Sequence, residues 1–415
     1  MSWRDTFAGR FGGVGAVSFL TYLGEYTSYL VVLAFISDKL TSGFGLGLFG
    51  YGLVGPISGA YLVTSGLVAV PIGHLSDKYG RRRFTVLGCL LGSAGLFMLV
   101  VADQLTDLVS FVVGMSLALT VLGIGHGTYT SSTLAYTGDI ATPEEVGRPY
   151  SLVELAEFAA YAFGPAVGAA VAFTQGRATT FVLSGLILVL AALIAAGLMP
   201  EPGARGRAGT ESRSESADWG VFFGLLRNPV VGATLLTTLV ASIGFSAFFY
   251  YVPIYAFSLR QAIPEFAYLY ALYASIMAGT GVLAMFPLGA LEDRTKLRMP
   301  VLVGGLLLGS LALLAVFFSA SPTTLLVASV AFGISLAMAR VSQLVILGER
   351  STFENRAAVM GTNHAVEHAG YGIGAVFGGV FVALFGLGPA FRILAVFLLL
   401  AALAFFAYAR RSKVR

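Results

Sequence analysis

The stretch Gly73-His-Leu-Ser-Asp-Lys-Tyr-Gly-Arg-Arg-Arg83 is a short charged hairpin between two long apolar segments. A second such stretch, Gly289-Ala-Leu-Glu-Asp-Arg-Thr-Lys-Leu-Arg298, lies in the second half of the chain. The flanking segments are long enough to cross a bilayer, for which a helix needs about 20 mainly apolar residues. Two copies of one charged hairpin in this setting indicate that an ancestral half was duplicated.

The composition places the chain in a lipid bilayer. Hydrophobic residues make up 57% of the 415 residues and charged residues only 11%, with a mean hydropathy of +0.85. Soluble domains carry about 25% charged residues. The net charge of +4 therefore reflects loops beside the membrane and not a nucleic-acid partner. The single cysteine, Cys89, permits no internal disulfide and no cysteine-based metal cluster, and no cofactor is expected.

Twelve apolar segments predict an all-α membrane protein. Most of the 25 Lys and Arg residues fall on the side that holds both termini, which predicts a multi-pass protein of the cell membrane with both ends cytoplasmic. The seventh segment contains Pro253, which is expected to kink or end its helix. The segments are residues 14–36, 49–72, 84–102, 108–135, 150–173, 179–198, 230–257, 266–288, 299–318, 323–347, 360–385 and 390–408.

A polar stretch divides the chain into two halves. Residues 200–218 are rich in Gly, Ser, Arg and Glu and predict a flexible cytoplasmic linker. The predicted domains are a six-helix bundle at 1–199, a linker at 200–227 and a second six-helix bundle at 228–415. Within the linker, residues 219–226 are expected to form a short helix on the membrane surface.

The fifth and eleventh segments match each other when the sequence is shifted by 210 residues, which predicts pseudo-symmetric bundles. At the same offset, Asp139 falls on Glu349. The matching pairs are Glu157 with Glu367, Tyr161 with Tyr371, Gly164 with Gly374, and Gly168 with Gly378.

These features resemble the major facilitator superfamily over essentially the whole chain. The first hairpin matches the family pattern G-x-x-x-D-[RK]-x-G-R-[RK] at Gly73, Asp77, Lys78, Gly80, Arg81 and Arg82, and a degenerate copy follows at Gly289, Asp293 and Arg294. The resemblance implies a monomeric secondary transporter that moves a small molecule by alternating access between two bundles.

The charged hairpins are expected to act as a conformational gate. A carboxylate is stabilised at a helix N-terminus, and the resemblance places Asp77 at the start of the eleventh helix and Asp293 at the start of the fifth. We expect Gly73 to let its helix end approach a neighbour, Gly80 to permit a turn, and Arg81 to pair with Asp139. The alternative is that the basic residues only fix the topology.

Ionisable residues at bilayer depth mark a pathway or a relay by default. Glu25, with Tyr22, Tyr26 and Tyr29 around it at helical spacing, is the first candidate for proton coupling or for binding a cationic substrate. A carboxyl at that depth is expected to carry a proton until water reaches it. The alternative is a protonated carboxyl that only bonds a neighbour. The further candidates are His126, Glu154, Glu157, Arg340, His364 and Glu367.

Two carboxylates, Glu154 and Glu157, lie one turn apart on the same helix face, so one of them is expected to hold a proton. Arg340 reaches a similar level from the opposite direction, which predicts an ion pair with Glu367. These residues either take part in a relay or form gate contacts that never touch substrate.

The stretch His364-Ala-Val-Glu-His368 spells H-x-x-E-H, a zinc-peptidase pattern. A third ligand is missing downstream, so an intramembrane metallohydrolase is a remote alternative and no resident metal site is assigned. A transported divalent metal ion that visits Glu154, Glu157, His364 or His368 is a further hypothesis.

Further signals resemble the drug:proton antiporter branches of the superfamily. Gly164, Pro165 and Gly168 resemble an antiporter element whose small residues permit close helix packing. In the fourth segment, however, His126 stands in a region where those antiporters carry an arginine, so His126 or Arg340 would have to replace it. The main hypothesis is proton-coupled efflux of a small lipophilic or cationic compound, with a non-enzymatic mechanism. The alternative is uptake or exchange of a sugar, an organic anion or a divalent metal ion.

Overall fold

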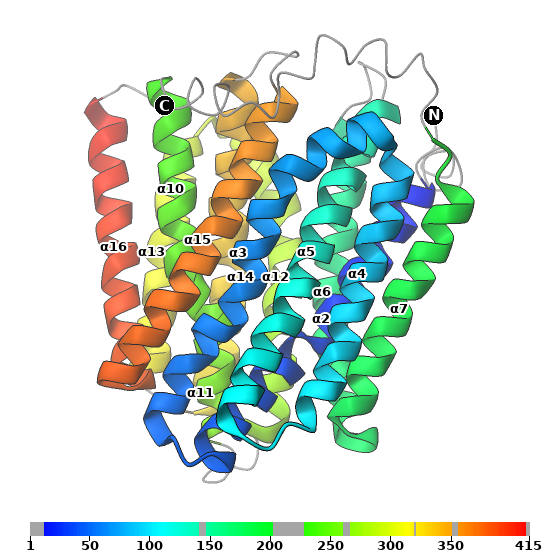
Figure 1. Cartoon of the computed structure of the whole chain (residues 1–415). Coiled ribbons are helices and arrows are strands. Elements are labelled where there is room, and N and C mark those ends of the chain that lie inside the picture. Colours follow the sequence, from blue (N-terminus) through cyan, green and yellow to red (C-terminus); the bar gives the residue numbers. More distant parts are fainter. Residues whose placement is uncertain are drawn as a thin grey trace. The chain divides into compact units, whose positions relative to one another are not determined.

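Helices account for the secondary structure of the chain in the computed structural model (Figure 1). The structure describes residues 12–140, 147–201, 228–259, 266–318, 321–350 and 356–411, and no strand occurs among them. Twelve helical stretches in this part of the chain are long and apolar enough to cross a membrane, which confirms the twelve predicted segments.

The first six spans lie before the linker and the last six after it. The first set is α2 (Gly12–Asp38, continued by the π-helical turn η1, Lys39–Gly43), α3 (Gly47–Tyr79), α4 (Arg81–Asp103), α5 (Leu108–Ile140), α6 (Gly147–Gln175) and α7 (Arg177–Leu198). The second set is α10 with η3 and α11 (Pro229–Ser246, Ala247–Tyr251, Val252–Ser258), α12 (Phe266–Thr295), α13 (Arg298–Phe318), α14 (Pro322–Arg350), α15 (Arg356–Phe385) and α16 (Leu387–Arg411).

Pro253 changes the seventh span without ending it. A proline in a helix lacks the N–H and its ring collides with the carbonyl four residues earlier. The five residues Ala247–Tyr251 form a π-helical turn directly before α11, and Pro253 occupies the first turn of α11. The wider turn accommodates the proline, so the predicted interruption is present as a π-helical insertion within one continuous span.

The charged hairpins are more helical than expected. Helix α3 continues through Gly73 to Tyr79, and α12 continues through Gly289 to Thr295. The chain turns at Gly80, with φ 111°, and at Lys296, with φ 58°. The turn expected at Gly80 is confirmed. Gly73 lies inside α3, and no described atom is within 4 Å of its Cβ position, so its close approach to a neighbour stays a prediction.

Helix pairs pack closely through glycines in both halves of the chain. A Cβ on Gly164 or Gly168 would clash with Tyr26 and Thr27 of α2, so α6 lies directly on α2, as predicted for this element. In the second half, Gly374 packs on Ile243 and Ser246 of α10. The same contact in both halves supports the duplication.

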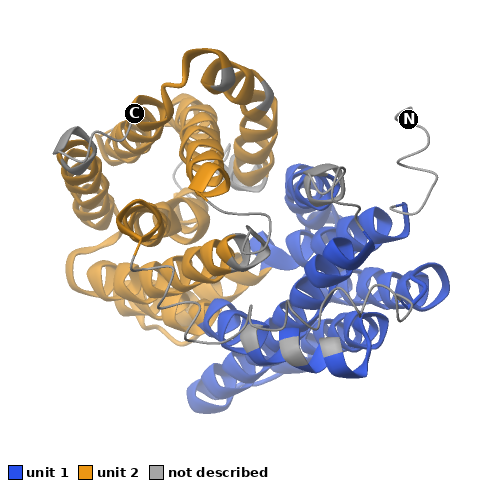
Figure 2. Cartoon of the chain, turned by 90° about the horizontal axis from the view of Figure 1, so that it is seen from above, with its two compact units in different colours: residues 1–31, 60–218 blue, residues 32–59, 219–415 orange. Residues whose placement is uncertain are grey.

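Two compact units emerge from the contacts within the chain (Figure 2). Unit 1 comprises residues 1–31 and 60–218, and unit 2 comprises residues 32–59 and 219–415. Helices α2 and α3 therefore each contribute to both units. The division into bundles at 1–199 and 228–415 stays a prediction. The surface helix expected at 219–226 and the linker beyond Glu201 lie outside the described residues.

Candidate functional site

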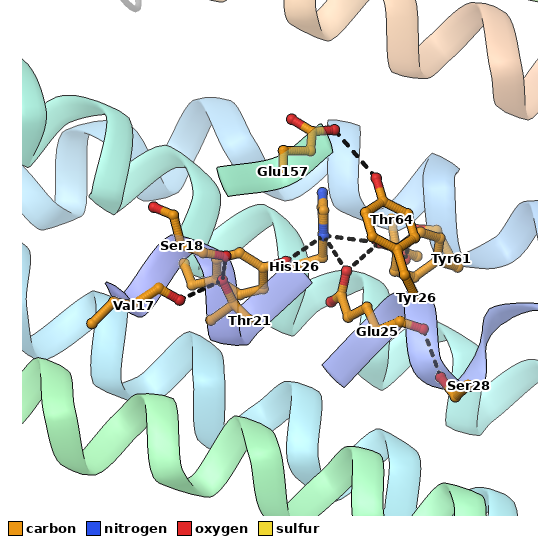
Figure 3. A network of polar contacts seen from close by, with 11 residues as sticks. Val17, Ser18, Thr21, Glu25, Tyr26, Ser28, Tyr61, Thr64, His126 and Glu157 are labelled. Carbon is orange, nitrogen blue, oxygen red and sulfur yellow. Dashed lines mark hydrogen bonds and ion pairs between the residues drawn. The ribbon is translucent and has the colours of Figure 1, made fainter. Parts of the chain in front are cut away.

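The centre of unit 1 holds a buried carboxyl–imidazole pair. Glu25 lies at the middle of α2 and is 6% exposed, while His126 lies on α5 and is 4% exposed. Glu25 Oε2 and His126 Nδ1 are 2.8 Å apart (Figure 3). A charge at such a site is stable only when it is paired or hydrogen-bonded, so the two groups depend on each other.

Two tyrosines complete this pair. The Tyr61 hydroxyl of α3 donates to Glu25 Oε2 at 2.8 Å and lies 2.8 Å from His126 Nδ1. The Tyr129 hydroxyl of α5 lies 2.9 Å from the same nitrogen. One ring nitrogen offers either one N–H or one lone pair. Glu25 Oε2 and the hydroxyl oxygens of Tyr61 and Tyr129 therefore bond His126 Nδ1 in alternative arrangements that differ in the position of the proton. Glu25, Tyr61, His126 and Tyr129 thus form one hydrogen-bonded cluster.

Aromatic rings surround the cluster. Tyr22 lies edge-on to both His126 and Tyr129, with ring centroids 6.1 and 6.0 Å away. On the next turn of α2, the Tyr26 ring lies 4.4 Å from the ring of Tyr161 on α6. Tyr29 lies edge-on to Tyr161 at 6.2 Å. The negative faces of such rings attract cations.

A second carboxylate, that of Glu157, bonds one of these tyrosines. The Tyr26 hydroxyl donates to Glu157 Oε1 at 3.2 Å, which connects α2 with α6 (Figure 3). Glu154 and Glu157 are both half-buried, and both exert an electrostatic influence on Tyr22. Unit 1 therefore brings Glu25, His126 and Glu157 together in one polar interior.

Unit 2 contains the predicted ion pair. Arg340 Nη1 of α14 lies 2.7 Å from Glu367 Oε1 of α15, and Tyr371, one turn further along α15, donates to the same oxygen at 3.4 Å. The Phe249 ring packs edge-on against Tyr371 at 5.0 Å. The contact is confirmed, whereas its role in transport stays a prediction.

The histidine rings of the H-x-x-E-H stretch lie close together and are tilted by 45° to each other. The ring centroids of His364 and His368 are 4.2 Å apart. Glu367 is engaged by Arg340 on α14. Within the described residues, no group of three or more His, Cys, Asp or Glu side chains is placed to hold a metal ion.

An arginine of each charged hairpin forms ion pairs within its own unit. Arg81 Nε lies 3.1 Å from Asp139 Oδ2, as predicted, and Arg81 Nη1 donates to Ser76 Oγ at 2.8 Å. In unit 2, Arg298 pairs with Glu349 and lies 3.9 Å from the fully buried Glu292. Lys78 and Arg294 are exposed. The side chains of Asp77 and Asp293 lie outside the described residues, so their expected helix contacts are not tested.

The family follows from comparison with known proteins. A family model described as the Major Facilitator Superfamily matches residues 14–294 and 269–415. The chain belongs to this superfamily. Membership in the superfamily identifies the protein as a membrane transporter and not an enzyme, which removes the metallohydrolase alternative.

Curated relatives within the superfamily are distant. The multi-drug resistance efflux pump PmrA homolog of Lactococcus lactis is 24% identical over 298 residues, 69% of this chain and 68% of that protein. The quinolone resistance protein NorA of Staphylococcus aureus is 23% identical over 55% of this chain and 54% of its own length. An uncharacterized MFS-type transporter of Methanocaldococcus jannaschii is 27% identical, with only 35% of its length matched.

Solved structures confirm the fold of the superfamily. A point mutant of the nucleoside transporter NupG aligns with a TM-score of 0.77 and 13% identity, covering 96% of this chain and 99% of its own. A D-xylose-proton symporter aligns with a TM-score of 0.74 and 15% identity, covering 95% and 96% of the two chains. At such identities the likeness concerns the twelve-helix fold alone.

Several residues of the site were not predicted from the sequence. Tyr61 and Tyr129 lie on α3 and α5, and nothing in their own segments distinguishes them from tyrosines that pack against lipid. Glu292 and Arg298 were also missed, although a signal existed. Arg298 lies nine residues after Gly289, as Arg81 lies eight residues after Gly73, and Glu349 matches Asp139.

Proposed function

We propose that this superfamily member couples proton movement to the export of a small lipophilic or cationic compound. Both termini would be cytoplasmic, the protein would act as a monomer in the cell membrane, and transport would proceed by alternating access. The observation that carries the proposal is the buried Glu25–His126 pair with its two tyrosine partners.

The pair has the chemistry that a proton carrier needs. With one proton shared between carboxyl and imidazole, the cluster is either an ion pair or two neutral groups, and both forms are hydrogen-bonded. Adding a second proton gives the cluster a net positive charge. Because a buried net charge is costly, this favours a conformation in which water reaches the cluster, or the release of a bound cationic substrate. Conformational exchange would then expose the cluster to each side of the membrane in turn.

His126 is the better substitute for the missing arginine of the fourth span. It lies 2.8 Å from Glu25, while Arg340 is bonded to Glu367 within unit 2. An imidazole also has a neutral form that can accept a proton, which a guanidinium in a protein does not have. His126 therefore serves both as the positive partner of Glu25 and as a proton carrier.

The relatives and neighbours favour different cargoes. PmrA homolog and NorA are named as drug-resistance proteins, whereas the structural neighbours include nucleoside and xylose transporters. The described interior of unit 1 carries Glu25, Glu154 and Glu157, which disfavours an organic anion. Sugar uptake remains the second candidate, because the D-xylose-proton symporter shares the fold.

Flux across proteoliposomes under an imposed pH gradient tests the proposal. Vesicles that contain the purified protein should transport a fluorescent lipophilic cation only when the gradient is present. Glu25→Gln and His126→Gln should each lower gradient-driven flux at least tenfold when flux is normalised to the amount of folded protein in the vesicles. Asp107→Asn, a charge removal at an exposed helix cap, is the matched control and should transport normally. Unchanged flux in Glu25→Gln would remove this residue from the mechanism.

A further inference from the structure

Three hydroxyl groups are buried near the Glu25–His126 pair in unit 1. Ser18 lies on α2, and Thr130 and Thr133 lie on α5, each of them no more than 5% exposed. Their hydroxyl oxygens have no hydrogen-bond partner among the described residues, and the same holds for Glu25 Oε1, whereas Oε2 of that carboxyl has two. A buried polar atom is costly unless it is hydrogen-bonded. We therefore expect a further partner at each of these four oxygens.

Other hydroxyls of the same two helices are satisfied by the backbone, which is a common arrangement for Ser and Thr within a helix. Four of them donate to a carbonyl three or four residues earlier, at 2.7–2.9 Å: Thr21, Thr128, Ser132 and Thr137. Ser18, Thr130 and Thr133 depart from this pattern, so their hydroxyls remain available to a ligand.

The contacts of the pair and its neighbours show the direction of α2 relative to α5. Glu25 bonds His126. Tyr22, three residues earlier on α2, lies edge-on to Tyr129, three residues later on α5. An earlier residue of α2 thus faces a later residue of α5, so the two helices are antiparallel along this contact.

The three hydroxyls continue the same contact away from the pair. Thr130 and Thr133 follow His126 by four and seven residues, so the three share one face of α5. Ser18 precedes Glu25 by seven residues, which is two turns of α2, and therefore reaches the level of Thr133. The oxygens without partners thus follow one another between two antiparallel helices.

We propose that Ser18, Thr130 and Thr133 hold a row of ordered water molecules, the water wire, which begins at Glu25 Oε1. Buried water is found where several polar groups converge, and it makes about three hydrogen bonds there. Neighbouring positions on one helix face lie about 5–6 Å apart. One water molecule spans that distance with two hydrogen bonds of about 2.8 Å each.

The water wire extends the pair toward the end of unit 1 at which Asp139 bonds Arg81. Resting on the proposed function, the inference makes the wire the route by which the pair exchanges its proton with that end. A proton passes from the pair to the first water molecule, which passes one of its own protons to the next. The wire therefore holds the same number of protons before and after each transfer.

Radiolytic hydroxyl-radical labelling of the purified full chain, read by mass spectrometry, tests the water wire. Radicals formed from bound water label a reactive side chain beside it even where bulk solvent does not reach. Tyr22 is buried and lies close enough to Thr130 to interact with it, without meeting the geometry of a hydrogen bond. Tyr251 is also buried, but its hydroxyl donates to the Ala375 carbonyl. We expect Tyr22 to be labelled at least fivefold faster than Tyr251.

Valine variants remove the hydroxyls and keep the shape of the side chains. The double variant Thr130→Val, Thr133→Val should lower the labelling rate of Tyr22 at least threefold, because the water loses two partners. Thr128→Val is the matched control on the same helix, since the Thr128 hydroxyl already donates to the Ile124 carbonyl at 2.7 Å. It should change the rate less than 1.5-fold. Equal labelling of Tyr22 and Tyr251 in the wild type, or equal rates in the double variant and Thr128→Val, would overturn the water wire.

Flux measurements separate this inference from the proposed function. The double variant should slow gradient-driven flux of the fluorescent cation rhodamine 6G at least fivefold. Its exchange of rhodamine 6G without a gradient should change less than twofold, because that exchange requires no proton transfer. Normal gradient-driven flux in the double variant would overturn the proton route. Fast labelling of Tyr22 in a wild type that shows no gradient-driven flux would instead overturn proton coupling and leave the bound water in place.

Discussion

Gly168 of α6 lies against the backbone of Thr27 on α2, so close that a Cβ would stand 1.7 Å from the Thr27 carbonyl oxygen. Helix α2 carries Glu25 and Tyr26, and α6 carries Glu157 and Tyr161. The distance between these two helices therefore sets the distance between the groups of the candidate site. The lack of a side chain at Gly168, as at Gly164, therefore permits the close packing that brings these groups together.

We expect Gly168→Ala to separate α6 from α2. Overpacking at such a contact costs about 1–3 kcal/mol or more, which corresponds to a loss of roughly 5 °C in Tm for a unit of this size. Thermal unfolding in detergent measures the effect. Gly66→Ala on α3 is the matched control, because no described atom lies within 4 Å of its Cβ position, and its stability should be unchanged or higher. Equal Tm values for both variants would contradict the packing argument.

Arg340→Ala should destabilise unit 2 because it leaves Glu367 buried without its 2.7 Å partner. Removing one member of a buried pair costs about 3–5 kcal/mol. The double variant Arg340→Ala, Glu367→Gln removes both charges and should recover part of this loss. Unfolding of the two single variants and the double variant gives the coupling energy. Additive losses would show that the pair is not energetically linked.

Arg298→Met should lower the stability of the protein more than Arg81→Met does. Arg298 lies beside both Glu349 and Glu292, and Glu292 is completely buried, whereas the first hairpin has the neutral Ser76 in the corresponding position. Loss of Arg298 leaves a buried carboxylate, with an expected cost of about 3–5 kcal/mol. Adding Glu292→Gln to Arg298→Met should restore stability. A lower Tm for Arg81→Met than for Arg298→Met would refute this asymmetry.

Gly55→Ala should separate the first half of α3 from α15. A Cβ at Gly55 would stand 1.7 Å from the Tyr251 hydroxyl and 2.1 Å from the Ala375 carbonyl oxygen, which itself accepts a hydrogen bond from Tyr251. The helices can separate only by breaking this contact, so the variant should favour the state in which they are apart.

A cysteine reporter measures that separation. Gly59→Cys fits, because its Cβ would meet Val376 and Ala375 at 3.5 and 3.8 Å, and Cys89→Ala supplies a background without the native thiol. We expect an impermeant maleimide to label the reporter at least threefold faster when Gly55→Ala is added. An unchanged labelling rate would mean that the α3–α15 contact does not control access.

The sequence was sufficient to predict the twelve spans, because each apolar segment exceeds the bilayer thickness and loop charges separate them. It also predicted the pairs Arg81–Asp139 and Arg340–Glu367, since charges at matching depth have few partners. Tyr61 and Tyr129 could not be predicted, because a tyrosine in an apolar span has the same local pattern whether it faces lipid or a buried carboxyl. The helical continuation through Gly73 was missed because hydropathy marks where the apolar stretch ends and not where helical hydrogen bonding ends.

The assignment of residues 32–59 to the same compact unit as 219–415 affects how the polypeptide can be divided. Cutting it within the linker would leave a leading fragment whose α2–α3 hairpin carries the stretch that packs with the trailing fragment. Neither fragment would then contain all the residues of a compact unit. Both fragments would have to be expressed together for either one to fold and accumulate.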